Sequence, residues 1–180
     1  MLTDQANYQF MARYTIDQTT NATLGVFGIP TLTADMPTTG TASFEGFGEV
    51  SEVYVDALPG VRSTVIDHVA SSTVDVNFLT NTVNAALQVS GALTPIGSQV
   101  DRLSARGMTL TGSSFSGGII NMFNNGERVY PNGTAANNSA AEQFYGAKRK
   151  ADGTLTPAEV GGVIHSSSAD GFVFGTFMAK

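Results

Sequence analysis

Residues 72–91, STVDVNFLTNTVNAALQVSG, indicate the fold class. In the first half every second residue is apolar, which places Val74, Val76 and Phe78 on one face of an extended chain. After the turn-forming residues Leu79-Thr80-Asn81, the alternation resumes with Ala85, Leu87 and Val89. Both halves are typical of strands with one face in a core and the other in water.

The same alternation, interrupted by turn-forming residues, recurs along the chain, and helical spacing of apolar residues is rare. We expect strands at residues 40–55, 61–70, 72–79, 83–92, 100–111, 113–122, 141–148, 160–166 and 171–178. Because 61–79 can be one long bent strand, we count eight. Eight antiparallel strands joined by hairpins close into a barrel, and closure removes both sheet edges. The last strand would then pair with an early one.

The predicted fold is therefore all-β, an eight-stranded antiparallel up-and-down β-barrel over residues 40–180. Residues 1–39 break the rhythm and are interpreted as an N-terminal appendage packed on the barrel. Within it, residues 7–16 suit a strand or a short helix, and residues 25–40 suit a loop. Residues 124–140 form a long polar insert, which suits either a binding loop or a tolerated surface insertion.

The composition narrows the classes of function. The chain has 180 residues, enough for one domain, with no cysteine and only 13% charged residues, about half the usual share. A net charge of −6 with nine Lys and Arg argues against nucleic acid as a partner. No apolar run is long enough for a transmembrane helix, and the first residues lack the pattern of a signal peptide. The composition suits an extracellular or cell-surface bacterial β-protein.

Catalytic and metal-binding patterns are weak. There are two histidines, no His-x-x-x-His pair and no Gly-x-Ser-x-Gly, so the sequence predicts neither an enzyme nor a metal site. His68 shares the parity of Val74 and is predicted to point inward, either as a hydrogen-bonded strand histidine or as a ligand of haem iron. His165 precedes three serines at a predicted strand end, which suits a rim contact. The further candidate ligand-binding residues are Arg128, Tyr130 and Tyr145.

Three stretches resemble the transferrin-binding protein B-like β-barrel family. They are STVDVNFLTNTVNAALQVSG, GSSFSGGI at residues 112–119, and the terminal segment from residue 140 to Lys180. The terminal segment contains Phe144-Tyr145-Gly146, Ala158-Glu159-Val160-Gly161-Gly162-Val163 and Gly175-Thr176-Phe177. Gly161 and Gly162 would let bulky neighbours approach, and Phe144, Phe172, Phe174 and Phe177 could fill the interior.

The resemblance implies an eight-stranded barrel, usually displayed on Gram-negative cells as a lipoprotein, that captures host iron proteins, haem or other ligands without catalysis. The function we expect is therefore a surface or secreted binding protein that takes a protein or small-molecule ligand at its loops. No cofactor is predicted, although haem is a possible ligand. The alternative is a structural or assembly protein whose barrel packs against copies of itself or a larger surface, because some strands are apolar on both faces.

Overall fold

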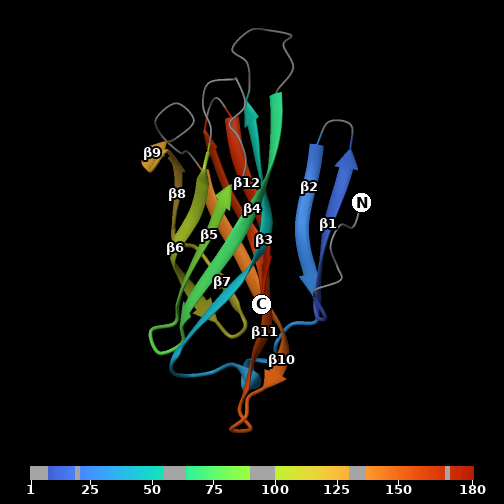
Figure 1. Ribbon diagram of the computed structural model, residues 1–180, viewed down its shortest axis with the longest axis vertical. Coiled ribbons are helices and arrows are strands. Elements are labelled where there is room, and N and C mark those ends of the chain that lie inside the picture. Colours follow the sequence, from blue (N-terminus) through green and yellow to red (C-terminus); the bar gives the residue numbers. More distant parts are fainter. Residues whose placement is uncertain (1–7, 19–20, 55–63, 90–99, 130–136, 169–170) are drawn as a thin grey trace.

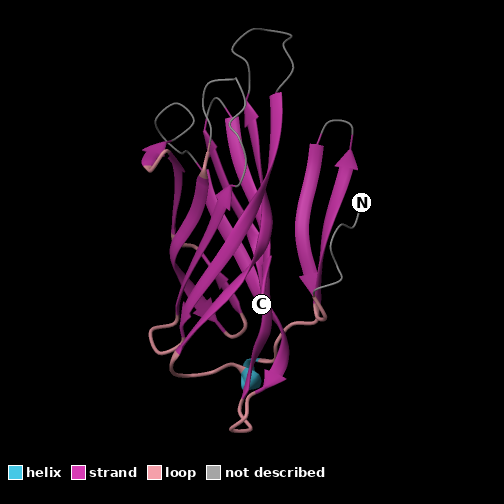
Figure 2. Ribbon diagram, viewed as in Figure 1, coloured by secondary structure: helices cyan, strands magenta, loops and turns pink. Residues whose placement is uncertain are grey.

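The computed structural model consists almost entirely of strands (Figures 1 and 2). It describes residues 8–18, 21–54, 64–89, 100–129, 137–168 and 171–180. These strands form a ten-stranded sheet and a separate two-stranded sheet. Among the described residues, none belongs to a helix with the length and apolar character needed to cross a membrane.

The large sheet closes into an eight-stranded antiparallel barrel with two extra strands. Its strands are β3 (Thr41–Tyr54), β4 (Thr64–Asn77), β5 (Thr82–Val89), β6 (Arg102–Thr111), β7 (Ser114–Ser116), β8 (Ile119–Asn124), β9 (Glu127–Val129), β10 (Asn137–Arg149), β11 (Leu155–Ser168) and β12 (Gly171–Ala179). The predicted fold class is confirmed, and the predicted segments 61–70 and 72–79 form the single long strand β4.

The last strand closes the barrel by pairing with the first barrel strand. β12 runs antiparallel to β3 from Gly171 opposite Tyr54 to Ala179 opposite Gly46. On the other side of β3, β4 and β5 follow in order, and β5 pairs with β6. The predicted pairing of the final strand with an early one is confirmed.

One barrel strand is interrupted. The predicted strand 113–122 is two strands, β7 and β8, separated by Gly117 and Gly118, whose φ angles are 81° and 79°. β7 and β8 pair with different halves of β6, and only β7 continues the barrel to β10. A Cβ atom on Gly118 would lie 2.6 Å from the Arg106 carbonyl oxygen, so the break requires glycine there.

Apolar side chains fill the barrel. We call the end at which β3, β5 and β11 finish the mouth, at the top of Figure 1, and the opposite end the base. Near the base, three phenylalanine rings surround Phe144, with centroids 5.1 to 6.5 Å from that of Phe144: Phe44, Phe78 and Phe115. Phe177 also faces inward, as predicted. Phe172 and Phe174 were expected inside but lie on the outer face, because the strand alternation turns Val173 inward instead.

The small sheet is a hairpin of β1 (Met11–Gln18) and β2 (Asn21–Gly28) beside the barrel (Figure 1). The expected loop over residues 25–40 is therefore wrong at residues 25–28. The glycines there weaken the strand signal, and pairing with β1 supplies the backbone hydrogen bonds that a strand needs. A short 3-10 turn, Thr33–Asp35, follows. The division into an appendage at 1–39 and a barrel domain at 40–180 stays a prediction.

The strands β10 and β11, which follow the polar insert, are longer than predicted. β10 begins at residue 137 and β11 spans residues 155–168, whereas strands were expected at 141–148 and 160–166. β9 also falls within the insert. The expected loop 124–140 therefore contains strand residues at both ends, and residues 130–136 lie outside the described part of the chain.

Candidate functional site

Polar side chains enter the barrel interior at the mouth. Glu52 near the end of β3, His68 near the start of β4 and Ser166 near the end of β11 all share the inward parity of their strands. Glu52 and Ser166 are buried, and the side chain of His68 is 14% exposed. The described interior below the mouth is mostly apolar, and the buried Glu142 of β10 is an exception.

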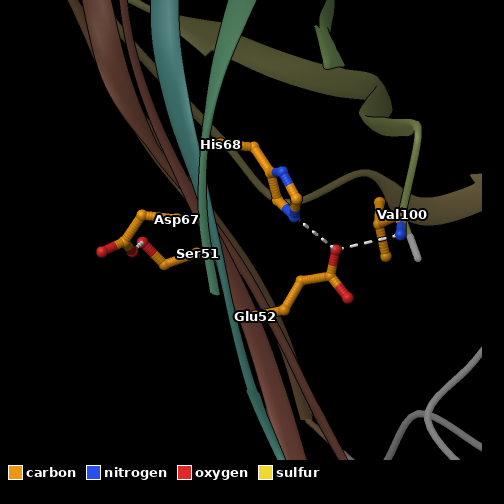
Figure 3. A network of polar contacts seen from close by, with 5 residues as sticks. All are labelled: Ser51, Glu52, Asp67, His68 and Val100. Carbon is orange, nitrogen blue, oxygen red and sulfur yellow. Dashed lines mark hydrogen bonds and ion pairs between the residues drawn. The ribbon is translucent and has the colours of Figure 1, made fainter. Parts of the chain in front are cut away.

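Glu52 and His68 are neighbours because of the strand register. Val50 pairs with His68 and Glu52 with Ile66, so Glu52 and His68 are diagonal neighbours on the inner face. Glu52 Oε1 accepts a hydrogen bond from the Val100 backbone N–H at 3.0 Å and lies 3.3 Å from His68 Nε2 (Figure 3). His68 Nε2 makes no hydrogen bond to Glu52, although the two atoms lie within ion-pair distance.

A second polar pair lies on the other side of the same strands. The Ser51 hydroxyl donates to Asp67 Oδ1, and Figure 3 shows this pair across the ribbon from His68 and Glu52. Ser51 and Asp67 are directly opposite in the β3–β4 register. The outer pair satisfies its own polar atoms, whereas the inner imidazole keeps Nε2 without a hydrogen bond.

The inner pair can therefore interact with a ligand that enters the mouth. A neutral imidazole nitrogen can bind iron or accept a hydrogen bond, and a protonated imidazole can donate one. The described residues contain no group of three or more His, Asp or Glu placed to hold a metal ion. The arrangement suits one contact to a larger ligand rather than a dedicated ion site.

The other predicted site residues are dispersed. His165 is half-buried on the outer face of β11, where its ring centroid is 6.2 Å from that of Phe172. Its predicted position at a strand end is wrong, because β11 continues to Ser168. Arg128 is exposed on β9, and Tyr130 lies outside the described residues. The two histidines do not form one site, because His68 points inward and His165 points outward.

Tyr145 lies under the hairpin, far from the mouth pair in the fold. Its ring is buried against Met11 and Met178, and its hydroxyl donates to the Val26 carbonyl oxygen at 3.4 Å. Burial raises the pKa of the Tyr145 hydroxyl above its usual value. These contacts make Tyr145 part of the junction between hairpin and barrel.

The terminal motif residues meet the hairpin as well. The carboxylate of Glu159 accepts hydrogen bonds from the backbone N–H groups of Gln9 at 2.6 Å and Phe10 at 2.9 Å. Gly146 has a φ of 58°, and a Cβ atom there would lie 2.2 Å from the Phe10 ring. A Cβ on Gly161 would lie 2.8 Å from Val26, which agrees with the expectation that glycine admits bulky neighbours. This set of contacts, here called the clasp, fixes the hairpin on the barrel.

Sequence reasoning missed Glu52, the partner of His68. The acidic residue stands in Glu49-Val50-Ser51-Glu52-Val53, where alternation marks Val50 and hence Glu52 as inward. The signal was present in the parity of β3, but a buried carboxylate is rare enough to be overlooked without its partner.

Among known proteins, similar ones were found by comparing structures and none by comparing sequences. No family model matches the chain, and no curated protein matches it. A transferrin-binding protein B mutant from Haemophilus parasuis superposes with a TM-score of 0.67 at 19% identity, covering 97% of this chain and 33% of that one. The isotype 1 transferrin-binding protein B of Neisseria meningitidis serogroup B gives 0.64 at 17% identity, with coverages of 97% and 32%.

A structure described as a surface lipoprotein superposes with a TM-score of 0.60 at 13% identity, covering 99% of this chain and 78% of that one. The chain thus spans about a third of the transferrin-binding proteins. The closed barrel and these superpositions together show that the chain has the fold of the transferrin-binding protein B-like β-barrels.

Proposed function

We propose that the chain is a non-enzymatic bacterial binding protein, surface-displayed or secreted, that captures a host ligand at the mouth of its barrel. The ligand class is haem, an iron protein or a similar solute. The fold is that of proteins named for binding transferrin and of a surface lipoprotein, which supports a binding role at the cell surface.

The observation that carries the proposal is the position of His68 and Glu52. At the mouth, the interior presents an imidazole with an unbonded Nε2 beside a buried carboxylate. Maintaining a carboxylate there is costly without compensation, so a retained polar pair favours a role in ligand contact. The strands β3, β5 and β11 all end at the mouth. Loops on a rigid scaffold commonly carry binding residues.

A haemin titration tests the proposal. Adding haemin to the intact chain should produce a Soret shift that saturates at one equivalent, and His68→Ala should weaken binding about tenfold or more. His165→Ala is the matched control, because His165 faces outward on the same barrel. A Soret shift that His68→Ala leaves unchanged would remove His68 from the site, and absence of any shift would reject haem as the ligand.

Exposed apolar side chains favour the alternative role of assembly. Ile29 and Leu32, between the hairpin and the 3-10 turn, are each 67% exposed. Large exposed apolar groups close together suit a protein interface. If this role holds, sedimentation velocity should show concentration-dependent association without ligand, and Ile29→Asn with Leu32→Asn should abolish it. A monomer at all concentrations would contradict this alternative.

A further inference from the structure

The outer face of β6 carries a polar run that the mouth pair does not use. Leu103 and Ala105 are fully buried inside the barrel, so alternation turns Arg102, Ser104 and Arg106 outward. Residues two apart on a strand stand side by side on one face. Two guanidinium groups therefore flank a hydroxyl group on the outer wall.

Two donors in this run are buried without a partner. Ser104 is 2% exposed and its Oγ makes no hydrogen bond, and Nε of Arg102 is likewise buried and unbonded. The Arg102 guanidinium lies 4.0 Å above the centroid of the Phe123 ring, which restrains it. Buried donors without partners are rare in folded proteins, so each one points to a missing acceptor.

A pocket of about 170 Å³ opens on this face. Arg102, Ser104 and Arg106 line one wall, and the small side chain of Ala86, opposite Ser104 in the register, leaves space beside them. Neither Arg102 nor Arg106 makes an ion pair with a described carboxylate. The pocket therefore combines space, positive charge and unbonded donors.

We propose that this outer-wall pocket binds a phosphate or sulfate group, either as the free ion or as a monoester. The planar guanidinium groups of Arg102 and Arg106 suit the oxygens of such a group, because each offers several N–H donors in a fixed geometry. The Ser104 hydroxyl supplies a further donor from the floor. The site is separate from the mouth, so its outcome is independent of haem binding.

Asp75 is the carboxylate that faces the pocket from β4. It accepts a hydrogen bond from the Ser43 hydroxyl at 2.8 Å and lines the wall opposite the arginines. Its negative charge opposes anion binding through space. Removing this charge should therefore tighten the complex.

The test is an NMR titration of the full chain with sodium sulfate and inorganic phosphate, against sodium chloride at equal ionic strength. The Arg102 Nε–Hε resonance should shift saturably with the oxyanions and not with chloride. Parallel titrations with glucose 6-phosphate and glucose 6-sulfate distinguish a site for a monoester from one for the free ion only.

Substitutions in and around the pocket should change the affinity for the anion in a specific pattern. Arg106→Gln and Ser104→Ala should each weaken binding by about tenfold, and Asp75→Asn should tighten it by about threefold. Arg149→Gln, an exposed arginine at the base, is the matched control and should change nothing. Equal weakening by Arg149→Gln, or no saturable shift in a folded protein, would overturn the proposal.

Discussion

Glu142 places a carboxyl group inside the barrel wall without a partner. It lies opposite Phe115 of β7 and Gly162 of β11, and neither carboxylate oxygen makes a hydrogen bond. Gly162 leaves the room, since a Cβ there would lie 2.1 Å from Glu142 Cγ. Burial raises the pKa of Glu142 well above its usual value, because the charged form loses hydration and gains nothing in return.

Stability should therefore fall as pH rises. Below about pH 4, near the pKa of an unfolded glutamate, both states hold the proton. At higher pH the unfolded chain ionises first, which lowers the free energy of unfolding until the folded group also loses its proton. Glu142→Gln should remove this dependence and stabilise the protein at pH 7 by on the order of 1–3 kcal/mol. Urea unfolding at several pH values measures it.

Glu127→Gln is the control for this series, because Glu127 is exposed on β9. Its pH profile should follow that of the wild-type chain. An unchanged profile in Glu142→Gln would show that Glu142 is not the group responsible.

For single residues, the sequence predicts the face of the strand on which a side chain lies better than it predicts which residues the side chain contacts. The inward position of His68 follows from its spacing to Val74 and is confirmed. Glu142 shares the parity of Phe144, which was expected inside, so its inward position could be predicted, but its lack of a hydrogen-bond partner could not.

Among the secondary-structure elements, the β1–β2 hairpin is attached to the barrel by the clasp. β1 and β2 pair only with each other, so their attachment depends on contacts such as those of Glu159 with Gln9 and Phe10. Linker residue Pro30 also bridges to Tyr145. Hydrogen bonds to a buried carboxylate are among the stronger ones, which makes Glu159 the point to test.

Glu159→Ala should loosen the hairpin while the barrel stays closed. Losing two charge-assisted hydrogen bonds should cost on the order of 2 kcal/mol. Hydrogen exchange of the amides of residues 9–12 should accelerate about tenfold or more, and that of β4 and β5 should not change.

Asp152→Ala is the matched carboxylate control, because Asp152 lies in the exposed β10–β11 turn and bonds Thr154. Exchange in the hairpin should not respond to it. If Glu159→Ala accelerates β4 and β5 equally, the clasp is part of global stability and the separation of hairpin from barrel is wrong.

Elements were predictable where alternation is unbroken and uncertain where glycine interrupts it. The strands around Val74 and Leu87 follow directly from the pattern. The interruption at Gly117–Gly118 was visible as glycine but not as a division between two pairing partners of β6. β6 also has a register shift against β5, between Val83 and Ala85, which the pattern of one strand does not reveal.

At the scale of the whole molecule, closure is the property that the sequence indicated most directly. Alternating strands joined by short turns leave two unpaired edges unless the last strand reaches the first. The β3–β12 pairing supplies that contact, and the phenylalanine cluster around Phe144 fills the base. The ligand was not predictable, because alternation identifies strands and carries no signature of a binding chemistry.

A disulfide engineered across the β3–β12 pair tests the closed barrel most directly. The chain has no cysteine of its own, so no native thiol interferes. Ser51 and Phe174 are directly opposite on the outer face, at a separation that antiparallel pairs share with disulfides. Oxidised Ser51→Cys/Phe174→Cys should cross-link within one monomer, whereas Ser51→Cys/Val173→Cys, whose side chains face opposite sides, should not. A free thiol pair in the first variant, or equal cross-linking in both, would contradict the closed barrel and its register.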